Sequence, residues 1–336
     1  MSKQFKEKFN IVITVGDEKG IGPEIILKAL SLKELHLKSK IIVVGSKKKL
    51  IAEYKLLKSI GTKRLKNPEE LEIEDITNSN FSKEMDNSGN ASFYYLQHAI
   101  EMVQSLPKAT LVTGPICKKS WAESGHHYPG QTEFLAESCN AKDVGMLFTA
   151  KSPITGWRFN TLLATTHIPL KEVPKHLNKN LIFSKLDQLS NFAKKFKNNP
   201  HLKIAGLNPH AGENGLLGLE ETAWMKETLE QWSDLNPNIK IEGPMSPDSC
   251  WISSAKAWQK EISEKNDGIL AMYHDQGLIP VKVIASNYSV NTTLGLPFVR
   301  TSPDHGTGFD IAGMGIAQCQ SMIEAIKTAR EFSLEL

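Results

Sequence analysis

Short β-branched apolar runs alternate with longer helical patterns along most of this chain, and this alternation limits the possible folds more than any other feature. Seven runs predict strands, at residues 10–16, 40–45, 109–114, 144–150, 159–167, 202–210 and 268–274. Helical patterns lie between them, at residues 22–30, 90–105, 179–197 and 220–232, and a last one lies near 315–333. Such alternation is typical of an α/β fold with largely parallel strands.

The length of the chain adds a second constraint. Its 336 residues exceed what most single hydrophobic cores contain, so we expect one large domain or two linked domains. No Pro- or Gly-rich linker marks a boundary, so any division must follow from topology. The Lys- and Glu-rich segment from about residue 53 to 86 is expected to form irregular surface structure.

Charge and cysteine content argue against several classes of protein. The formal net charge is only +3, from 40 basic and 37 acidic residues, which gives no reason to expect a nucleic-acid partner. No apolar run is long enough to cross a bilayer, and the N-terminal segment lacks the apolar region of a signal peptide. The four cysteines are widely spaced and form no C-x-x-C pair, as expected for free thiols in a reducing compartment. We therefore expect a cytoplasmic protein.

Three of the predicted strands end in histidine, namely His167, His210 and His274. In open parallel sheets, ligands bind beyond the carboxyl ends of the strands, where side chains from different strands converge. Three neutral imidazoles there would suit zinc, cobalt or another borderline divalent ion and would leave coordination positions free. The intervals between these histidines carry no metal signature, so unrelated roles for the three side chains stay open. His126 and His127 are interpreted as turn residues outside any site.

Two loop-like segments contain the other polar candidates. The segment 206–221 places His210 and Glu213 within one glycine-containing loop. The segment 290–313 contains Asn291, Arg300, Asp304 and His305 among several glycines. Arginine binds phosphate or carboxylate in a bidentate manner, and lysine supplies a compact positive charge. Lys282, Asn291 and Arg300 could therefore hold an anionic substrate, although each could equally be a surface or ion-pair residue.

The first turn, "VGDEKGIGPEI" at 15–25, follows a predicted strand and opens a helix, with Pro23 in the first helical turn. Its glycines at 16, 20 and 22 do not form the G-x-G-x-x-G dinucleotide fingerprint, nor does the turn match a phosphate-binding P-loop. A nucleotide would have to bind in another way, and the sequence assigns no residue to that role.

Seven segments together resemble the 4-hydroxythreonine-4-phosphate dehydrogenase family of pyridoxal phosphate biosynthesis. They occur in the order found in that family and extend the resemblance from residue 11 to about 330: "GDEKGIGPEI", "VTGPICKKSW", "GQTEFLAE", "ATTHIPL", "GLNPHAGENG", "AMYHDQGLIPVK" and "VNTTLGLPFVRTSPDHGTG".

The resemblance implies an α/β fold of the isocitrate/isopropylmalate dehydrogenase type, with the active site in a cleft and at a homodimer interface. Residues 1–130 and 285–336 would form the first α/β domain, and residues 131–284 would form the second, which carries the metal ligands.

The activity that the resemblance implies is NAD-dependent oxidation of 4-(phosphooxy)-L-threonine, followed by decarboxylation to 3-amino-2-oxopropyl phosphate. A divalent metal, zinc or alternatively magnesium or cobalt, would be held by His167, His210 and His274, shared between two subunits. The metal would lower the pKa of the substrate hydroxyl and polarise the resulting ketone.

The family's substrate-contacting and catalytic positions are also matched in this sequence. The family's substrate-contacting positions correspond here to Gln131, Thr132, Lys282, Asn291 and Arg300. Asp248 or Asp275 would orient a ligand or relay a proton, and Lys282 is also a candidate general base.

Two segments depart from the family pattern. Gln131 stands where the family usually has histidine, and a glutamine cannot carry charge or a titrating proton. Glu18 and Lys19 replace the usual Pro–Ala pair in the first loop. These changes leave open a sister dehydrogenase that acts on threonate or erythronate 4-phosphate. From other functional classes, a three-histidine metal-dependent hydrolase and a binding protein without turnover also remain to be tested.

Overall fold

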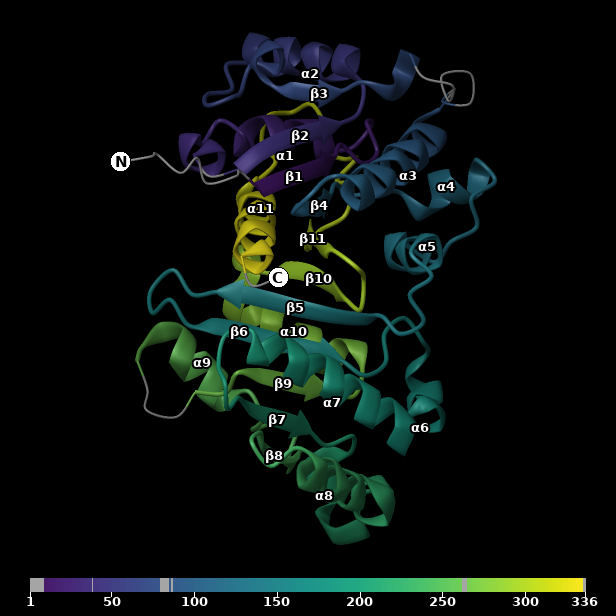
Figure 1. Ribbon diagram of the computed structural model, residues 1–336, viewed down its shortest axis with the longest axis vertical. Helices are drawn as coiled ribbons and strands as arrows, with labels where there is room; N and C mark the ends of the chain where they lie inside the picture. The colour runs from purple at the N-terminus through teal and green to yellow at the C-terminus, as the bar shows by residue number, and fades with distance from the viewer. Residues whose placement is uncertain (1–8, 38, 79–84, 86, 262–264, 335–336) are drawn as a thin grey trace. The chain divides into compact units, whose positions relative to one another are not determined.

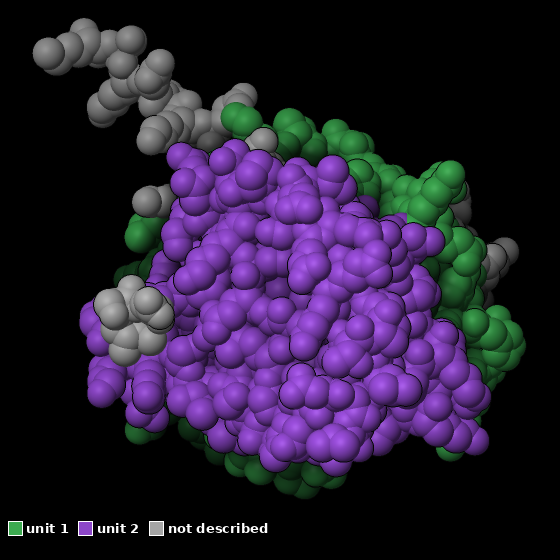
Figure 2. Space-filling view, turned by 90° about the horizontal axis from the view of Figure 1, so that it is seen from below, with its two compact units in different colours: residues 1–142, 296–336 green, residues 143–295 purple. Residues whose placement is uncertain are grey.

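A computed structural model describes residues 9–37, 39–78, 85, 87–261 and 265–334 of the chain. The chain forms two compact units. Unit 1 contains Met1–Lys142 and Leu296–Leu336, and unit 2 contains Asp143–Gly295 (Figure 2). The sequence-based division instead has boundaries at 130/131 and 284/285, and as a division into functional domains it stays a prediction.

Unit 1 contains a parallel sheet with the strand order β3-β2-β1-β4-β11 (Figure 1). Its strands are β1 (Phe9–Thr14), β2 (Ser39–Val44), β3 (Glu72–Glu74), β4 (Ala109–Thr113) and β11 (Val299–Pro303). The central strands are buried and rich in Ile, Val and Leu, as expected for parallel strands. The last strand, β11, comes from the C-terminal segment, so unit 1 requires both ends of the chain.

Six α-helices belong to unit 1: α1 (Gly22–Ala29), α2 (Lys47–Ser59), α3 (Ser88–Ser105), α4 (Lys118–Glu123), α5 (Gln131–Ser138) and α11 (Gln320–Ser333), as counted over the described residues. Pro23 lies in the first turn of α1, as the sequence predicted, and Ser46 caps α2 by accepting a hydrogen bond from Lys49 N at 3.3 Å. The expectation of irregular structure from residue 53 was wrong for its first part, because α2 continues to Ser59.

Unit 2 contains a mixed sheet with the strand order β10-β5-β6-β9-β7-β8. Its strands are β5 (Gly145–Lys151), β6 (Arg158–Leu163), β7 (His201–Ala205), β8 (Lys240–Met245), β9 (Gly268–Ala271) and β10 (Val290–Leu294). Strand β5 pairs antiparallel with β6 and with β10, whereas β6, β9, β7 and β8 are parallel. The carboxyl ends of these four parallel strands therefore lie at one edge.

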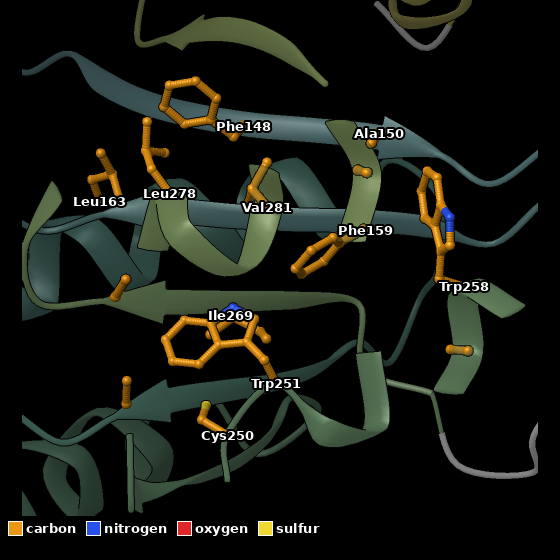
Figure 3. Close-up of a cluster of buried hydrophobic side chains, with 14 of the residues drawn as sticks. Phe148, Ala150, Phe159, Leu163, Cys250, Trp251, Trp258, Ile269, Leu278 and Val281 are labelled. Atoms are coloured by element: carbon orange, nitrogen blue, oxygen red, sulfur yellow. The ribbon is translucent and has the colours of Figure 1, made fainter. Parts of the chain in front are cut away.

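The α-helices described in unit 2 are α6 (Val173–His176), α7 (Lys179–Lys194), α8 (Lys226–Leu235), α9 (Ile252–Gln259) and α10 (His274–Ala285). Helix α7 lies in front of β6 and β9 in Figure 1, and α10 lies behind them. On the α10 side, Leu278 and Val281 pack against Phe148 and Phe159 from the sheet, next to Trp251 (Figure 3). This core fixes the position of α10, whose first residue is His274.

Short helical turns complete the chain. The 3₁₀ segments are Lys33–His36, Pro68–Glu70, Ile76–Asn78, Leu170–Glu172, Pro209–Gly215 and Ser286–Tyr288, and one π-helical turn spans Glu221–Met225. Each of the seven predicted strands is found, and the predicted α/β class is confirmed. Strands β3, β8, β10 and β11 were not predicted. Among the described residues, no helix has the length and apolar character needed to span a membrane.

Candidate active site

The three candidate metal-binding histidines lie beyond the strands rather than at their last residues. Strand β6 ends at Leu163, β7 ends at Ala205 and β9 ends at Ala271. The sequence-based strands were therefore too long at their carboxyl ends, because the apolar pattern continues into segments that leave the sheet. His274 is instead the first residue of α10.

His167 and His274 lie close together within unit 2. Their ring centroids are 5.4 Å apart, with an interplanar angle of 45°. The parallel pairing of β6 with β9 brings their segments side by side, and Thr165 donates through its backbone N and Oγ1 to Met272 O, at 3.2 Å and 2.7 Å. Both imidazoles line a pocket of about 230 Å³, together with Thr166, Ile168, Leu170, Val173, Tyr273 and Asp275.

Asp275 contacts the imidazole of His274. The distance from His274 Nδ1 to Asp275 Oδ1 is 2.7 Å. A carboxylate at Nδ1 favours the tautomer with the proton on that nitrogen, which leaves the lone pair of Nε2 for another partner. Asp275 itself is exposed, so its effect is on the tautomer and ring orientation of His274 rather than on stability.

His210 occupies an unusual backbone turn. Residues 210–214 all have positive φ angles, including +50° at His210 and +43° at Glu213. Such angles are uncommon for residues other than glycine and persist only where surrounding contacts impose them. His210 Nδ1 lies 3.4 Å from Glu213 Oε2, and the His210 side chain is 62% exposed. The predicted His210–Glu213 proximity is therefore present.

Asp248 is a fully exposed carboxylate in the segment after β8. The hydrogen bond from Ser246 Oγ to Asp248 Oδ1, at 2.5 Å, is the main cause that lowers its pKa, and the His210 imidazole lowers it further. Asp248 and His210 thus interact electrostatically within unit 2.

One chain does not assemble a three-ligand metal site among its described residues. No group of three or more His, Cys, Asp or Glu side chains there is arranged to hold a metal ion. The structure thus brings His167 and His274 together, but it does not join His210 to them in such a group.

Arg300 lies in the interior of unit 1, on strand β11 rather than in a loop as the sequence indicated. It is only 3% exposed, and its Nη2 donates to Thr113 Oγ1 at 2.7 Å. Burial lowers the pKa of the guanidinium to about 10, and Glu133 partly opposes this shift. The side chain therefore stays positively charged at neutral pH. Thr113 was not predicted as a site residue because a threonine in a buried β-branched run has the pattern of an ordinary strand residue.

Gln131 and Thr132 begin helix α5 in unit 1. Gln131 Nε2 donates to Gly114 O at 3.1 Å. Because the carbonyl of Gly114 can only accept a hydrogen bond, the side-chain amide of Gln131 must direct its NH₂ group, not its oxygen, toward Gly114. Gln131 Oε1 is buried and has no hydrogen-bond partner. Arg300 and Gln131 are thus attached to the consecutive residues Thr113 and Gly114.

The remaining candidates lie on other elements of the two units. Lys282 is exposed on α10, and Asn291 lies on β10 with its Oδ1 buried and without a hydrogen-bond partner. Asp304 N donates to Ser321 Oγ at 3.0 Å, and His305 Nδ1 lies 3.0 Å from Gly306 O. His126 stacks on Phe93 with ring centroids 3.6 Å apart, as part of an aromatic cluster in unit 1.

A family profile described as "Pyridoxal phosphate biosynthetic protein PdxA" matches residues 37–329. The chain belongs to this family. The 4-hydroxythreonine-4-phosphate dehydrogenase of Synechococcus sp. (strain RCC307) is 50% identical to it over 330 residues, covering 96% of this chain and 98% of the relative. The enzyme of the same name from Synechococcus sp. (strain JA-3-3Ab) is 45% identical over 334 residues, covering 96% and 94%.

A solved structure leads to the same family. The crystal structure of 4-hydroxythreonine-4-phosphate dehydrogenase from Klebsiella pneumoniae superposes with a TM-score of 0.77 at 29% sequence identity, covering 99% of each chain. The family that the seven sequence motifs predicted is therefore confirmed, and so is the fold expected from it.

Proposed function

We propose that this PdxA-family protein is a 4-hydroxythreonine-4-phosphate dehydrogenase of pyridoxal phosphate biosynthesis. It would oxidise the secondary hydroxyl of 4-(phosphooxy)-L-threonine with NAD, and the resulting β-keto acid would lose carbon dioxide to give 3-amino-2-oxopropyl phosphate. The observation that carries this proposal is the 50% identity to an enzyme of that name over 96% of this chain.

The donor set in unit 2 fits a divalent metal. Two imidazoles with centroids 5.4 Å apart can both bind one ion whose Zn–N distances are about 2.0–2.1 Å. His167, His274 and His210 would hold the ion, zinc by preference, with magnesium or cobalt as alternatives. When bound, the metal would supply Lewis acidity for hydroxyl ionisation and for polarisation of the ketone.

The chain's own residues account for the remaining steps of this proposal. Asp275 holds the proton on His274 Nδ1, so that Nε2 keeps its lone pair. Arg300 would bind an anionic group of the substrate, because its buried guanidinium stays charged at neutral pH. Lys282 is the proposed general base or charge partner for the hydroxyl proton, and Asp248 is a proposed proton relay beside His210.

The remaining proposed contacts concern the rest of the substrate. Gln131, Thr132 and Asn291 would complete its binding. NAD would accept the hydride, and its binding residues stay unassigned.

Because the described residues of one chain present no group of three metal ligands, we propose a homodimer in which the metal ligands come from two subunits. The four cysteines are free thiols, which supports a cytoplasmic location.

Gln131 supports a second candidate within the same reaction class. Its buried Oε1 has no partner and can only accept a hydrogen bond, so it would not attract a fully ionised phosphate. An enzyme for threonate or erythronate 4-phosphate would use the same metal and NAD but would turn over the amino-acid substrate poorly.

The test is NADH absorbance with metal-loaded protein, NAD and either 4-(phosphooxy)-L-threonine or threonate 4-phosphate. We expect rapid turnover of the amino-acid substrate, strong loss in His210→Ala and little change in the control His176→Ala, whose exposed ring lies 2.9 Å from Glu172 O. Turnover of threonate 4-phosphate alone would support the second candidate. Absence of NADH with both substrates, despite bound metal, would contradict the dehydrogenase assignment.

A further inference from the structure

Buried hydrogen bonds join the three histidine-bearing segments of unit 2 into one network. The segment before His167 is attached to the segment before His274, because Thr165 donates twice to Met272 O. Met272 N in turn donates to Gln276 Oε1 at 2.6 Å. Gln276 Nε2 then donates to Gly206 O at 2.7 Å, at the start of the segment that leads to His210. The network thus connects the ends of β6, β9 and β7.

Gln276 occupies the central position in this network. It is 8% exposed and lies in the first turn of α10, directly after the His274–Asp275 pair. One end of its amide must accept from a backbone N–H, and the other must donate to a backbone carbonyl. A glutamate could satisfy only the first requirement, and an apolar residue could satisfy neither. This position therefore specifically requires a carboxamide.

Glu221 holds the other side of the His210 segment. It is fully buried, and its Oε1 accepts hydrogen bonds from Leu207 N and Asn208 N, each at 2.7 Å. Its Oε2 accepts from Asn208 Nδ2 at 2.9 Å. A buried carboxylate costs free energy unless such hydrogen bonds compensate for its lost hydration. Here all three bonds reach the two residues that precede the Pro209–Gly215 turn.

The backbone around Glu221 adds a second sign of a specialised segment. Glu221 is the first residue of a π-helical turn. Such turns are rare in proteins overall, but those that occur often lie at functional sites. The left-handed turn that carries His210 also requires external support. Gly218 leaves room for the side chain of Asn208, which bonds to Glu221, since a Cβ at Gly218 would lie 2.2 Å from Asn208 Nδ2.

We propose that Gln276 and Glu221 are positioning residues that fix the metal-binding histidines before any metal arrives. Gln276 sets the start of α10, and therefore His274, relative to the end of β7. Glu221 imposes the turn that carries His210. This inference rests on the proposed function, because it requires that these histidines bind a divalent metal.

Binding of Co²⁺ to the full-length protein tests the inference without use of the enzymatic reaction. Titration followed by the visible absorbance of Co²⁺ reports both affinity and ligand geometry. We expect Gln276→Met to weaken Co²⁺ binding by about 10–100-fold, the usual effect of removing a group that orients a metal ligand, and to change the absorbance bands. Glu221→Gln should act in the same direction, because its new NH₂ group would face the NH₂ of Asn208.

Ser152→Ala is the matched control. Ser152 is 3% exposed in unit 2, accepts hydrogen bonds from Ile154 N and Thr155 N, and donates to Trp258 O. Its loss should lower thermal stability as a buried polar deletion does, yet leave the Co²⁺ affinity and bands unchanged. If Gln276→Met does not fold, Gln276→Glu replaces it, since this variant keeps the acceptor for Met272 N and loses only the donor to Gly206 O.

Three outcomes are distinguishable. Weaker binding and altered bands in the Gln276 and Glu221 variants, but not in the Ser152 control, would support the inference. Wild-type affinity and bands in those variants would overturn it while leaving the metal site intact. If the wild-type protein itself binds no Co²⁺, the metal site of the proposed function is overturned, and the inference with it.

Discussion

Arg300 keeps a positive charge inside unit 1, and this charge constrains what can bind beside it. Arg300 is 3% exposed and its guanidinium is bonded to Thr113, so a ligand at this position would meet a cation that water screens weakly. The sequence identified Arg300 as a candidate from its chemistry. The sequence did not predict that Arg300 is buried, because the charged and polar residues of β11 have the pattern of a loop. Only the pairing of β11 with β4 shows that this segment is a strand.

Replacement of Arg300 by lysine should raise KM for the phosphorylated substrate. We expect about a tenfold increase or more, because one hydrogen bond to a charged group contributes about 1.5–3 kcal/mol. Steady-state kinetics would measure it, with Arg330→Lys as the control in unit 1, where Arg330 bonds to Glu34 O. Since burial lowers the pKa of Arg300 to about 10, KM of the unmutated enzyme should also rise as the pH increases through that value. An unchanged KM in Arg300→Lys would remove Arg300 from the substrate site.

Glu18 is a half-buried acid in one of the two segments that depart from the family pattern. Burial is the main cause that raises its pKa above the usual 4.5, while the hydrogen bond from Tyr95, at 2.5 Å, acts in the opposite direction. The folded state therefore retains a proton at pH values where the unfolded chain has already lost it. Stability from this group is present at low pH and decreases as the pH rises from 4.5 through the folded-state pKa.

Glu18→Gln should accordingly increase the free energy of unfolding at pH 7, by about 1 kcal/mol, because it keeps an acceptor for Tyr95 and removes the half-buried charge. Urea denaturation at pH 5 and pH 7 would measure the change, and the gain should be larger at pH 7. A variant that is less stable than the unmutated protein at both pH values would show that the carboxylate of Glu18 stabilises the fold.

At the scale of single elements, helix α7 depends on the side chain of Asn178, whose Oδ1 accepts from Leu181 N at 3.0 Å. We expect Asn178→Ala to lower the free energy of unfolding by about 1 kcal/mol, the usual cost of losing an N-cap. Asn178→Asp should be close to neutral, since it keeps the acceptor. Thermal or urea denaturation would compare the two, and equal losses in both variants would argue against a capping role.

The elements that were missed share a physical cause. Strand β8 has the sequence "KIEGPM", whose glycine and proline argue against a strand in a prediction from sequence. It nevertheless pairs with β7 and is an edge strand of the sheet in unit 2. The network of Gln276 and Glu221 was also missed, because both residues stand beside more conspicuous motif residues. Local pattern indicates which segments are apolar, whereas strand pairing and buried polar contacts depend on partners distant in sequence.

At the scale of the whole chain, the seven motifs indicated the family, and the alternation of strands and helices indicated the class. The limits of the compact units could not be predicted, because they depend on which strands pair and no linker composition marks them. The sequence also could not show which candidate site residues belong to which unit. His167 and His274 meet in unit 2, whereas Arg300 and Gln131 approach one another in unit 1.

Unit 2 is a continuous stretch of chain with its own core, which predicts that residues 143–295 fold when produced alone. We expect this fragment to unfold cooperatively in urea, as followed by far-UV circular dichroism. Residues 1–142 without the C-terminal segment should not do so, because their sheet would lack strand β11 and the helix α11 that packs on β4 and β11. Cooperative folding of that shorter fragment would contradict this dependence.

The position of β11 in unit 1 has a consequence during synthesis on the ribosome. Strand β4 carries Leu111 and Val112, and one side of it stays unpaired until residues 299–303 have been translated. An open strand edge can pair with other chains, so the nascent polypeptide is exposed to misassociation for as long as unit 2 is being made. Early folding of residues 143–295 would make this part of the chain compact, so that β11 would have a shorter distance to cross before it reaches β4. Translation speed across the codons for residues 143–295 should therefore affect the yield of native protein.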